Sequence, residues 1–141
     1  MPADEFLFGA ELTDAERDDI REALERHSIP LAPGLNARPI EIALRDSTGK
    51  LVGGLLGSTA WDWLLIDLLW VDESCRGQGL GAELLEKAEY QAGKLGCTQA
   101  RAETFDFQAL PFYRQHGYEA YAALEGFPKG HTEYQLRKSL P

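Results

Sequence analysis

The segment best suited to chemistry covers residues 76–81 and reads RGQGLG. Its three glycines stand at alternate positions, where they allow a tight turn and keep side chains out of a ligand's path. A helix that starts here would point its unpaired first amides outward, and its dipole would add positive potential. Arg76 adds a fixed positive charge. We therefore predict an anion site suited to phosphate, with a purely structural strand-to-helix turn as the alternative.

Other phosphate motifs fit this segment less well. A P-loop would need Gly-Lys-Ser or Gly-Lys-Thr where this chain has Gly81-Ala82-Glu83, and the G-x-G-x-x-G fingerprint is missed by one residue. The segment resembles the R/Q-x-x-G-x-G/A signature of the GNAT acyltransferases. Downstream, residues 109–118 (ALPFYRQHGY) are similar to the A-x-x-F-Y-x-x-x-G-[YF] segment of that family. The resemblance covers about residues 40–138.

The resemblance implies acetyl-CoA as cosubstrate, held by first-turn amides at its pyrophosphate and by the preceding strand along its pantetheine arm. The family often has Asn at the position of Asp106, so this residue could instead cap the short helix or bind the acceptor amine. The residues expected to bind the cosubstrate are Leu69, Trp70, Val71, Arg76, Gly77, Gln78, Gly79, Leu80, Gly81, Ala82, Asp106 and Tyr113.

Two side chains are candidates for catalysis. Amide formation from a thioester needs a neutral amine, a polarised carbonyl and a proton for the departing thiolate. The resemblance implies Tyr113 as the acid. Asp67 is our candidate base, because a carboxylate inside an apolar strand needs a partner or a purpose. Glu103 is a second candidate, and either carboxylate could be a structural hydrogen-bond acceptor.

Several aromatic and imidazole side chains are less specific. Aromatic residues at turns and strand ends often line an acceptor pocket, although they form hydrophobic core more often. The two histidines His116 and His131 have no ligand-spaced partners, and we expect them at the surface or in turns. The aromatic candidates for the acceptor pocket are Trp61, Trp63, Phe105 and Phe107.

Hydrophobic periodicity and turn signals predict a single mixed α/β domain over residues 1–141, with a largely antiparallel sheet flanked by helices. A Thr13–Glu16 capping box should start the first helix. The strand over 64–71 is almost wholly apolar, as in a strand buried on both faces. The expected strands are 6–8, 40–44, 51–59, 64–71, 100–104, 118–123 and 132–138, and the expected helices are 13–27, 79–95 and 109–116.

The amino-acid composition argues against several classes of partner and cofactor. The net charge of −9 argues against nucleic-acid and anionic-lipid partners and slightly favours a cationic acceptor. The two cysteines lack metal-ligand spacing and no signal peptide is visible, so we expect no metal and a cytoplasmic location. We predict an N-acetyltransferase that acts on a primary amine of a small molecule, and the resemblance implies a homodimer. The alternatives are a non-catalytic acyl-CoA-binding regulatory module and an acetyltransferase of protein N-termini or lysines.

Overall fold

The computed structural model describes residues 5–141, and the chain divides into two compact units, Met1–Leu35 and Asn36–Pro141. The expectation of one domain over residues 1–141 stays a prediction. No helix of the described residues is both long enough and apolar enough to cross a membrane.

The first unit contains the helix α1 (Asp14–Ser28). Its predicted capping box is confirmed, since the Glu16 amide donates to Thr13 Oγ1 at 3.1 Å and the Thr13 amide donates to Glu16 Oε1 at 2.9 Å. The expected strand over 6–8 is wrong. Residues 6–8 are exposed and pair with no strand of the described chain, and a strand is stable only when a neighbour pairs its backbone.

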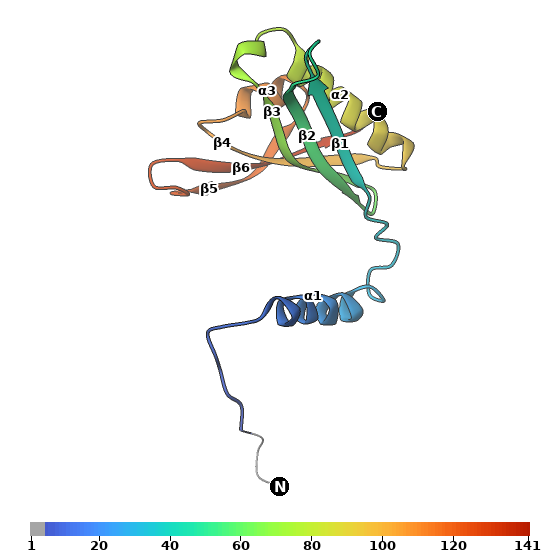
Figure 1. Cartoon of the computed structure of the whole chain (residues 1–141), viewed down its shortest axis with the longest axis vertical. Coiled ribbons are helices and arrows are strands. Elements are labelled where there is room, and N and C mark those ends of the chain that lie inside the picture. The colour runs from blue at the N-terminus through green and yellow to red at the C-terminus, as the bar shows by residue number, and fades with distance from the viewer. Residues whose placement is uncertain (1–4) are drawn as a thin grey trace. The chain divides into compact units, whose positions relative to one another are not determined.

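The second unit is built on a six-stranded sheet in the order β1-β2-β3-β4-β6-β5 (Figure 1). All neighbouring strands are antiparallel except β3 and β4, which are parallel. The prediction of a mixed, largely antiparallel sheet with helices is therefore confirmed. The elements are β1 (Pro39–Arg45), β2 (Leu51–Ala60), β3 (Trp63–Val71), a short 3-10 helix (Glu73–Cys75), α2 (Leu80–Lys94), β4 (Gln99–Phe105), α3 (Leu110–Gln115), β5 (Glu119–Glu125) and β6 (Thr132–Ser139).

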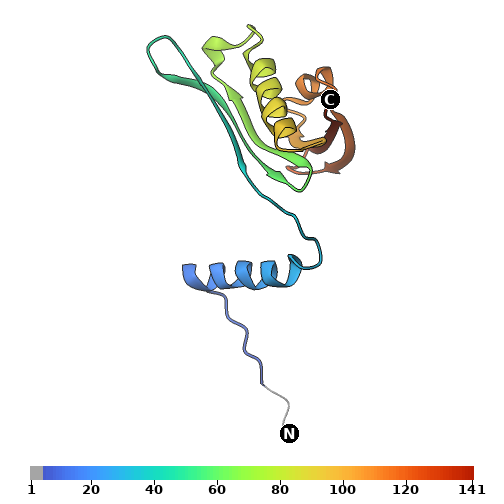
Figure 2. The same cartoon turned by 90° about the vertical axis from the view of Figure 1, so that its right-hand side faces the viewer.

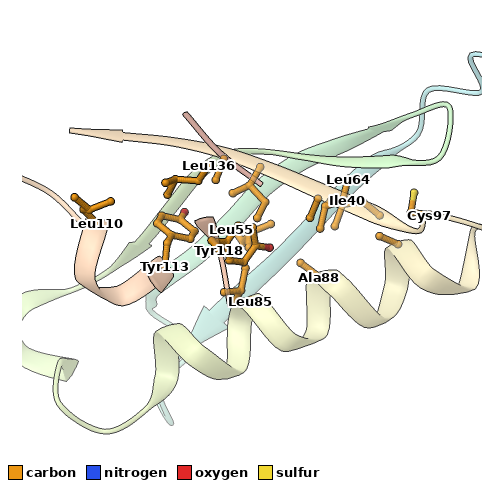
Figure 3. Close-up of a cluster of buried hydrophobic side chains, with 14 residues drawn as sticks. Ile40, Leu55, Leu64, Leu85, Ala88, Cys97, Leu110, Tyr113, Tyr118 and Leu136 are labelled. Atoms are coloured by element: carbon orange, nitrogen blue, oxygen red, sulfur yellow. The ribbon is translucent and has the colours of Figure 1, made fainter. Parts of the chain in front are cut away.

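The main core lies between α2 and one face of the sheet. Figure 2 shows α2 running along that face, and Figure 3 shows Leu85 and Ala88 pointing from the helix toward the strands. The opposite side of β3 is different: Leu68 is 63% exposed and Trp70 is 47% exposed. The expectation that this strand is buried on both faces is therefore wrong for its second half, because α2 covers only one face.

Two features of β3 create the space for a site. The first is that its parallel pairing with β4 joins Trp63–Ile66 to Gln99–Ala102 and ends there. The second is a bulge, because Ile66 pairs with Gly57 of β2 while Leu68 pairs with Leu56. Asp67 is thus the extra residue of the bulge. A bulge bends its strand and re-aims a side chain, here at the point where β3 and β4 part.

The bulge depends on the glycine opposite it. A Cβ atom added to Gly57 would lie 2.5 Å from the carbonyl oxygen of Leu65, which is far closer than real Cβ contacts. A glycine inside a strand often marks a bulge or a close approach of backbone, and Gly57 lies at both.

We predict that Gly57→Ala lowers the free energy of unfolding by about 1–3 kcal/mol, because the methyl group must displace the backbone of β3. The matched control is Gly93→Ala on α2, where an added Cβ meets nothing within 4 Å. That variant should gain about 0.5–1 kcal/mol, as alanine does over glycine in a helix. Urea denaturation measures both. Equal midpoints for Gly57→Ala and the wild type would show that the bulge tolerates a side chain.

Candidate active site

A pocket of about 810 Å³ lies where β3 and β4 part, and it reaches the start of α2 and one side of α3. It brings together most of the residues predicted from the sequence. Of the residues expected to bind the cosubstrate or to act in catalysis, Gln78 and Asp106 do not line it. The expected residues that do line it are Asp67, Leu69, Trp70, Val71, Arg76, Gly77, Gly79, Leu80, Gly81, Ala82 and Tyr113.

The glycine loop leaves the first amides of α2 open. Gly77 has a φ of 80°, and Gly79, the N-cap residue, has a φ of 77°. Residues other than glycine rarely adopt this left-handed backbone conformation. No side chain caps the helix, so the amides of residues 80–82 have no acceptor from a capping side chain. These donors and the positive end of the helix dipole face the pocket, which fits an anionic ligand such as a pyrophosphate.

Side-chain hydrogen bonds hold this loop in place. Arg76 Nε donates to the carbonyl oxygen of Val71 at 3.0 Å, which ties the loop to the end of β3. The hydroxyl and the amide of Ser74 both donate to the Asp72 carboxylate, and these bonds lower the pKa of Asp72 below its usual value. The remaining guanidinium nitrogens of Arg76 are placed to bind a ligand's anionic group.

Tyr113 brings a hydroxyl group to the pocket from a buried position on α3. Only 5% of its surface is exposed. Its ring packs against Phe112 and Tyr118 with centroid distances of 5.3 Å, and Figure 3 shows Tyr113 beside Tyr118 in the core. Burial raises the pKa of Tyr113 to about 12. The phenol therefore keeps its proton at neutral pH, as a general acid must.

Two carboxylates stand where the strands part. Asp67 makes no hydrogen bond or ion pair with any residue that the structure describes, although it lines the pocket. Glu103 follows Ala102, the last residue of β4 that pairs with β3, and its carboxylate binds Arg101 Nη2 at 3.0 Å. Asp67 is therefore the pocket carboxylate that is free to accept a proton or bind a cation.

Asp106 has a different set of partners from those expected. Its carboxylate contacts His131 Nδ1 at 2.9 Å and accepts a hydrogen bond from the Thr132 amide at 3.1 Å. The expectation that it could cap the short helix is wrong, because no side chain caps α3 and the Asp106 carboxylate is bound to His131 and Thr132 instead. Its contact with the cosubstrate stays a prediction.

For other aromatic and imidazole residues, the prediction from the sequence agrees only in part with the structure. His116 lies in the turn after α3, as expected, and it also lines the pocket and packs on Phe112 with a ring distance of 4.8 Å, which was not predicted. Their spacing of four on one helix was the available signal. Phe107 lines the pocket as expected. Phe105 does not line it, and neither do Trp61 and Trp63, which lie near the other end of β3. Within residues 5–141, no three His, Cys, Asp or Glu side chains gather as metal ligands.

Comparison with known proteins agrees with this geometry. A sequence model of the acetyltransferase (GNAT) family matches residues 8–118. The chain is 41% identical over 129 residues to the blasticidin-S acetyltransferase of Streptomyces morookaense, covering 89% of this chain and 91% of that protein. It is 33% identical over 130 residues to acetyltransferase Atu2258 of Agrobacterium fabrum, covering 92% and 95% respectively.

A crystal structure of an acetyltransferase from Bacillus cereus superimposes with a TM-score of 0.88 at 31% identity, covering 95% of this chain and 98% of that one. The site and the fold thus define an acyl-CoA-dependent transferase. The chain belongs to the GNAT family of acetyltransferases, which use acetyl-CoA.

We predict that Arg76→Gln weakens acetyl-CoA binding about tenfold, because a hydrogen bond to a charged group contributes about 1.5–3 kcal/mol. Titration calorimetry gives the dissociation constant. The matched control is Arg114→Gln, which changes an exposed arginine of α3 outside the pocket. Equal affinities for the two variants would remove Arg76 from the binding site.

Proposed function

We propose that this protein transfers an acetyl group from acetyl-CoA to a primary amine of a small molecule, by direct attack in a ternary complex. One observation carries the proposal: a single pocket joins an anion site, a buried protonated phenol and an unpaired carboxylate. The anion site is formed by Arg76 and the first amides of α2, the phenol is Tyr113, and the carboxylate is Asp67.

The first half of the reaction needs a neutral amine. An ammonium group that enters the pocket would give one proton to Asp67, directly or through water, and the free amine would attack the thioester carbonyl carbon. Beyond Ile66 the edge of β3 that faces β4 is no longer paired, so its backbone amides are available to polarise the carbonyl oxygen. Residues 69–71, which follow on this strand and were expected to bind the cosubstrate, all line the pocket.

The second half needs a proton for the leaving group. The new C–N bond forms and the C–S bond breaks. The nitrogen, which has already given its first proton to Asp67, releases its second proton to solvent water, and the thiolate gains a proton. Tyr113 supplies the thiolate's proton and is reprotonated from solvent. The products are the N-acetylated amine and coenzyme A. The pKa of Tyr113, which burial raises to about 12, means that the phenol still holds its proton at neutral pH when the thiolate departs.

A small-molecule acceptor has the stronger support among the possible amines. The relative from Streptomyces morookaense, at 41% identity over most of both chains, is named for acetylation of blasticidin S. The open pocket carboxylate also fits a small cationic amine. A regulatory module that only binds acyl-CoA would not need the unpaired Asp67 or the buried phenol beside the same pocket.

We predict that Tyr113→Phe lowers kcat by about 10²–10⁴-fold, the usual contribution of a positioned acid, and leaves the affinity for acetyl-CoA within about twofold. Steady-state release of the coenzyme A thiol measures kcat with an amine found by screening. Tyr121→Phe, on the exposed strand β5, is the matched control and should behave like the wild type. Unchanged kcat in Tyr113→Phe would assign the proton to water.

We predict that Asp67→Asn lowers kcat/KM and removes the rising limb of its pH profile, because the amide cannot take the ammonium proton. Glu41→Gln, on exposed surface of β1, controls for the loss of one negative charge. An unchanged pH profile in an Asp67→Asn variant of unchanged stability would exclude Asp67 as the base.

A further inference from the structure

An exposed row of aromatic rings lies beside the pocket. We call Phe127, Phe105, Phe107 and His131 the aromatic row. Phe105 and Phe107 are stacked, with centroids 5.0 Å apart and planes at 11°. Phe127 packs on Phe105 at 5.9 Å, and His131 packs edge-on against Phe107 at 4.9 Å. Phe107 is the member of the row that lines the pocket, and it is 55% exposed, so its ring is available to a ligand there.

Polar contacts hold the aromatic row together. Asp106 binds His131 and the amide of Thr132 through its carboxylate, and its own amide donates to the Thr132 carbonyl oxygen at 3.0 Å. The end of β4 is thereby joined to the turn between β5 and β6. The rings are positioned before any ligand arrives, which reduces the entropy cost of binding.

The charged side chains of the pocket are separated by sign. The positive charge of Arg76 stands beside the glycine loop and the start of α2. The carboxylates of Asp67 and Glu103 stand where β3 and β4 part, and Glu103 is partly neutralised by Arg101. A ligand group beside the carboxylates is therefore favoured if it is cationic, and nearby aromatic rings attract a cation further.

We propose that the aromatic row and these carboxylates form an acceptor subsite for a cationic amine that carries a flat unsaturated ring. The ring lies against Phe107, the reacting amine faces Asp67, and a second positive charge faces Glu103. This inference rests on the proposed function, because it assigns the acceptor to the same pocket. An aliphatic polyamine would use only the carboxylates, so the stacked Phe105–Phe107 pair is what selects for a planar ring.

Three probe amines separate the ring from the charge. 1,4-Bis(aminomethyl)benzene has a ring and a second cation, 1,6-diaminohexane has the second cation without a ring, and 4-methylbenzylamine has the ring without the second cation. We expect the first probe to exceed each of the others about tenfold in kcat/KM at saturating acetyl-CoA, since one aromatic contact or one cation contact changes binding by about that factor.

The variants assign each preference to its side chain. In Phe107→Leu, the kcat/KM values for the two diamines should lie within about twofold of each other. In Glu103→Gln, the ratio of kcat/KM for 1,4-bis(aminomethyl)benzene to that for 4-methylbenzylamine should be smaller than in the wild type. Tyr121→Leu changes an exposed aromatic residue outside the pocket and should keep the wild-type ratios. Turnover with ratios that do not respond to Phe107→Leu would overturn the inference and leave the proposed function intact.

A binding measurement covers the case of no turnover. If the wild type acetylates none of the probes, the affinity for 1,4-bis(aminomethyl)benzene is measured by calorimetry in the presence of saturating coenzyme A. Binding that is lost in Phe107→Leu and kept in Tyr121→Leu would support the subsite while the proposed transfer fails. The absence of binding to the wild type would overturn the inference.

Discussion

The parting of β3 from β4 is the constraint on which the site depends. A parallel pair normally fills the space between its strands with hydrogen bonds, and here the pairing stops at Ile66 and Ala102. Beyond that point β3 is held by β2 alone, through a bulge that only a glycine at position 57 accommodates. Buried backbone groups need partners. The open edge of β3 can find them in a bound substrate, and the same gap admits the phenol of Tyr113.

A second consequence is the electrostatic division of one pocket. The chain carries a net charge of −9, yet it builds an anion site. It does so locally, with uncapped amides at the start of α2, the helix dipole and the single guanidinium of Arg76. The carboxylate of Asp67 lies where the strands part. Phosphate groups and an amine can therefore enter one pocket without competing for the same contacts.

The sequence predicted the parts of the site whose signals are local. The glycine loop, the capping box of α1 and the Tyr113 helix each depend on residues close together in the chain, and the structure has them where expected. The expected strand over 6–8 failed because a local apolar run does not show whether a partner strand exists.

Local sequence patterns could not predict the contacts between segments that are distant in the chain. The bulge at Asp67 depends on its register with Gly57, and the partner of Asp106 is His131, 25 residues away. The aromatic row joins β4 to the turn before β6, so neither segment alone indicates it. The hydrophobic periodicity of one segment does not show which residue of another segment lies opposite it.

The most direct test of the account is a backbone amide NMR titration of the protein with coenzyme A. The account predicts that the largest shifts fall on Leu80, Gly81 and Ala82 at the start of α2 and on residues 68–71 of β3. The amides of β5, which lie outside the pocket, should stay unchanged. Shifts confined to other parts of the chain, with the α2 amides unperturbed, would contradict the claim that the opening between β3 and β4 is the cosubstrate site.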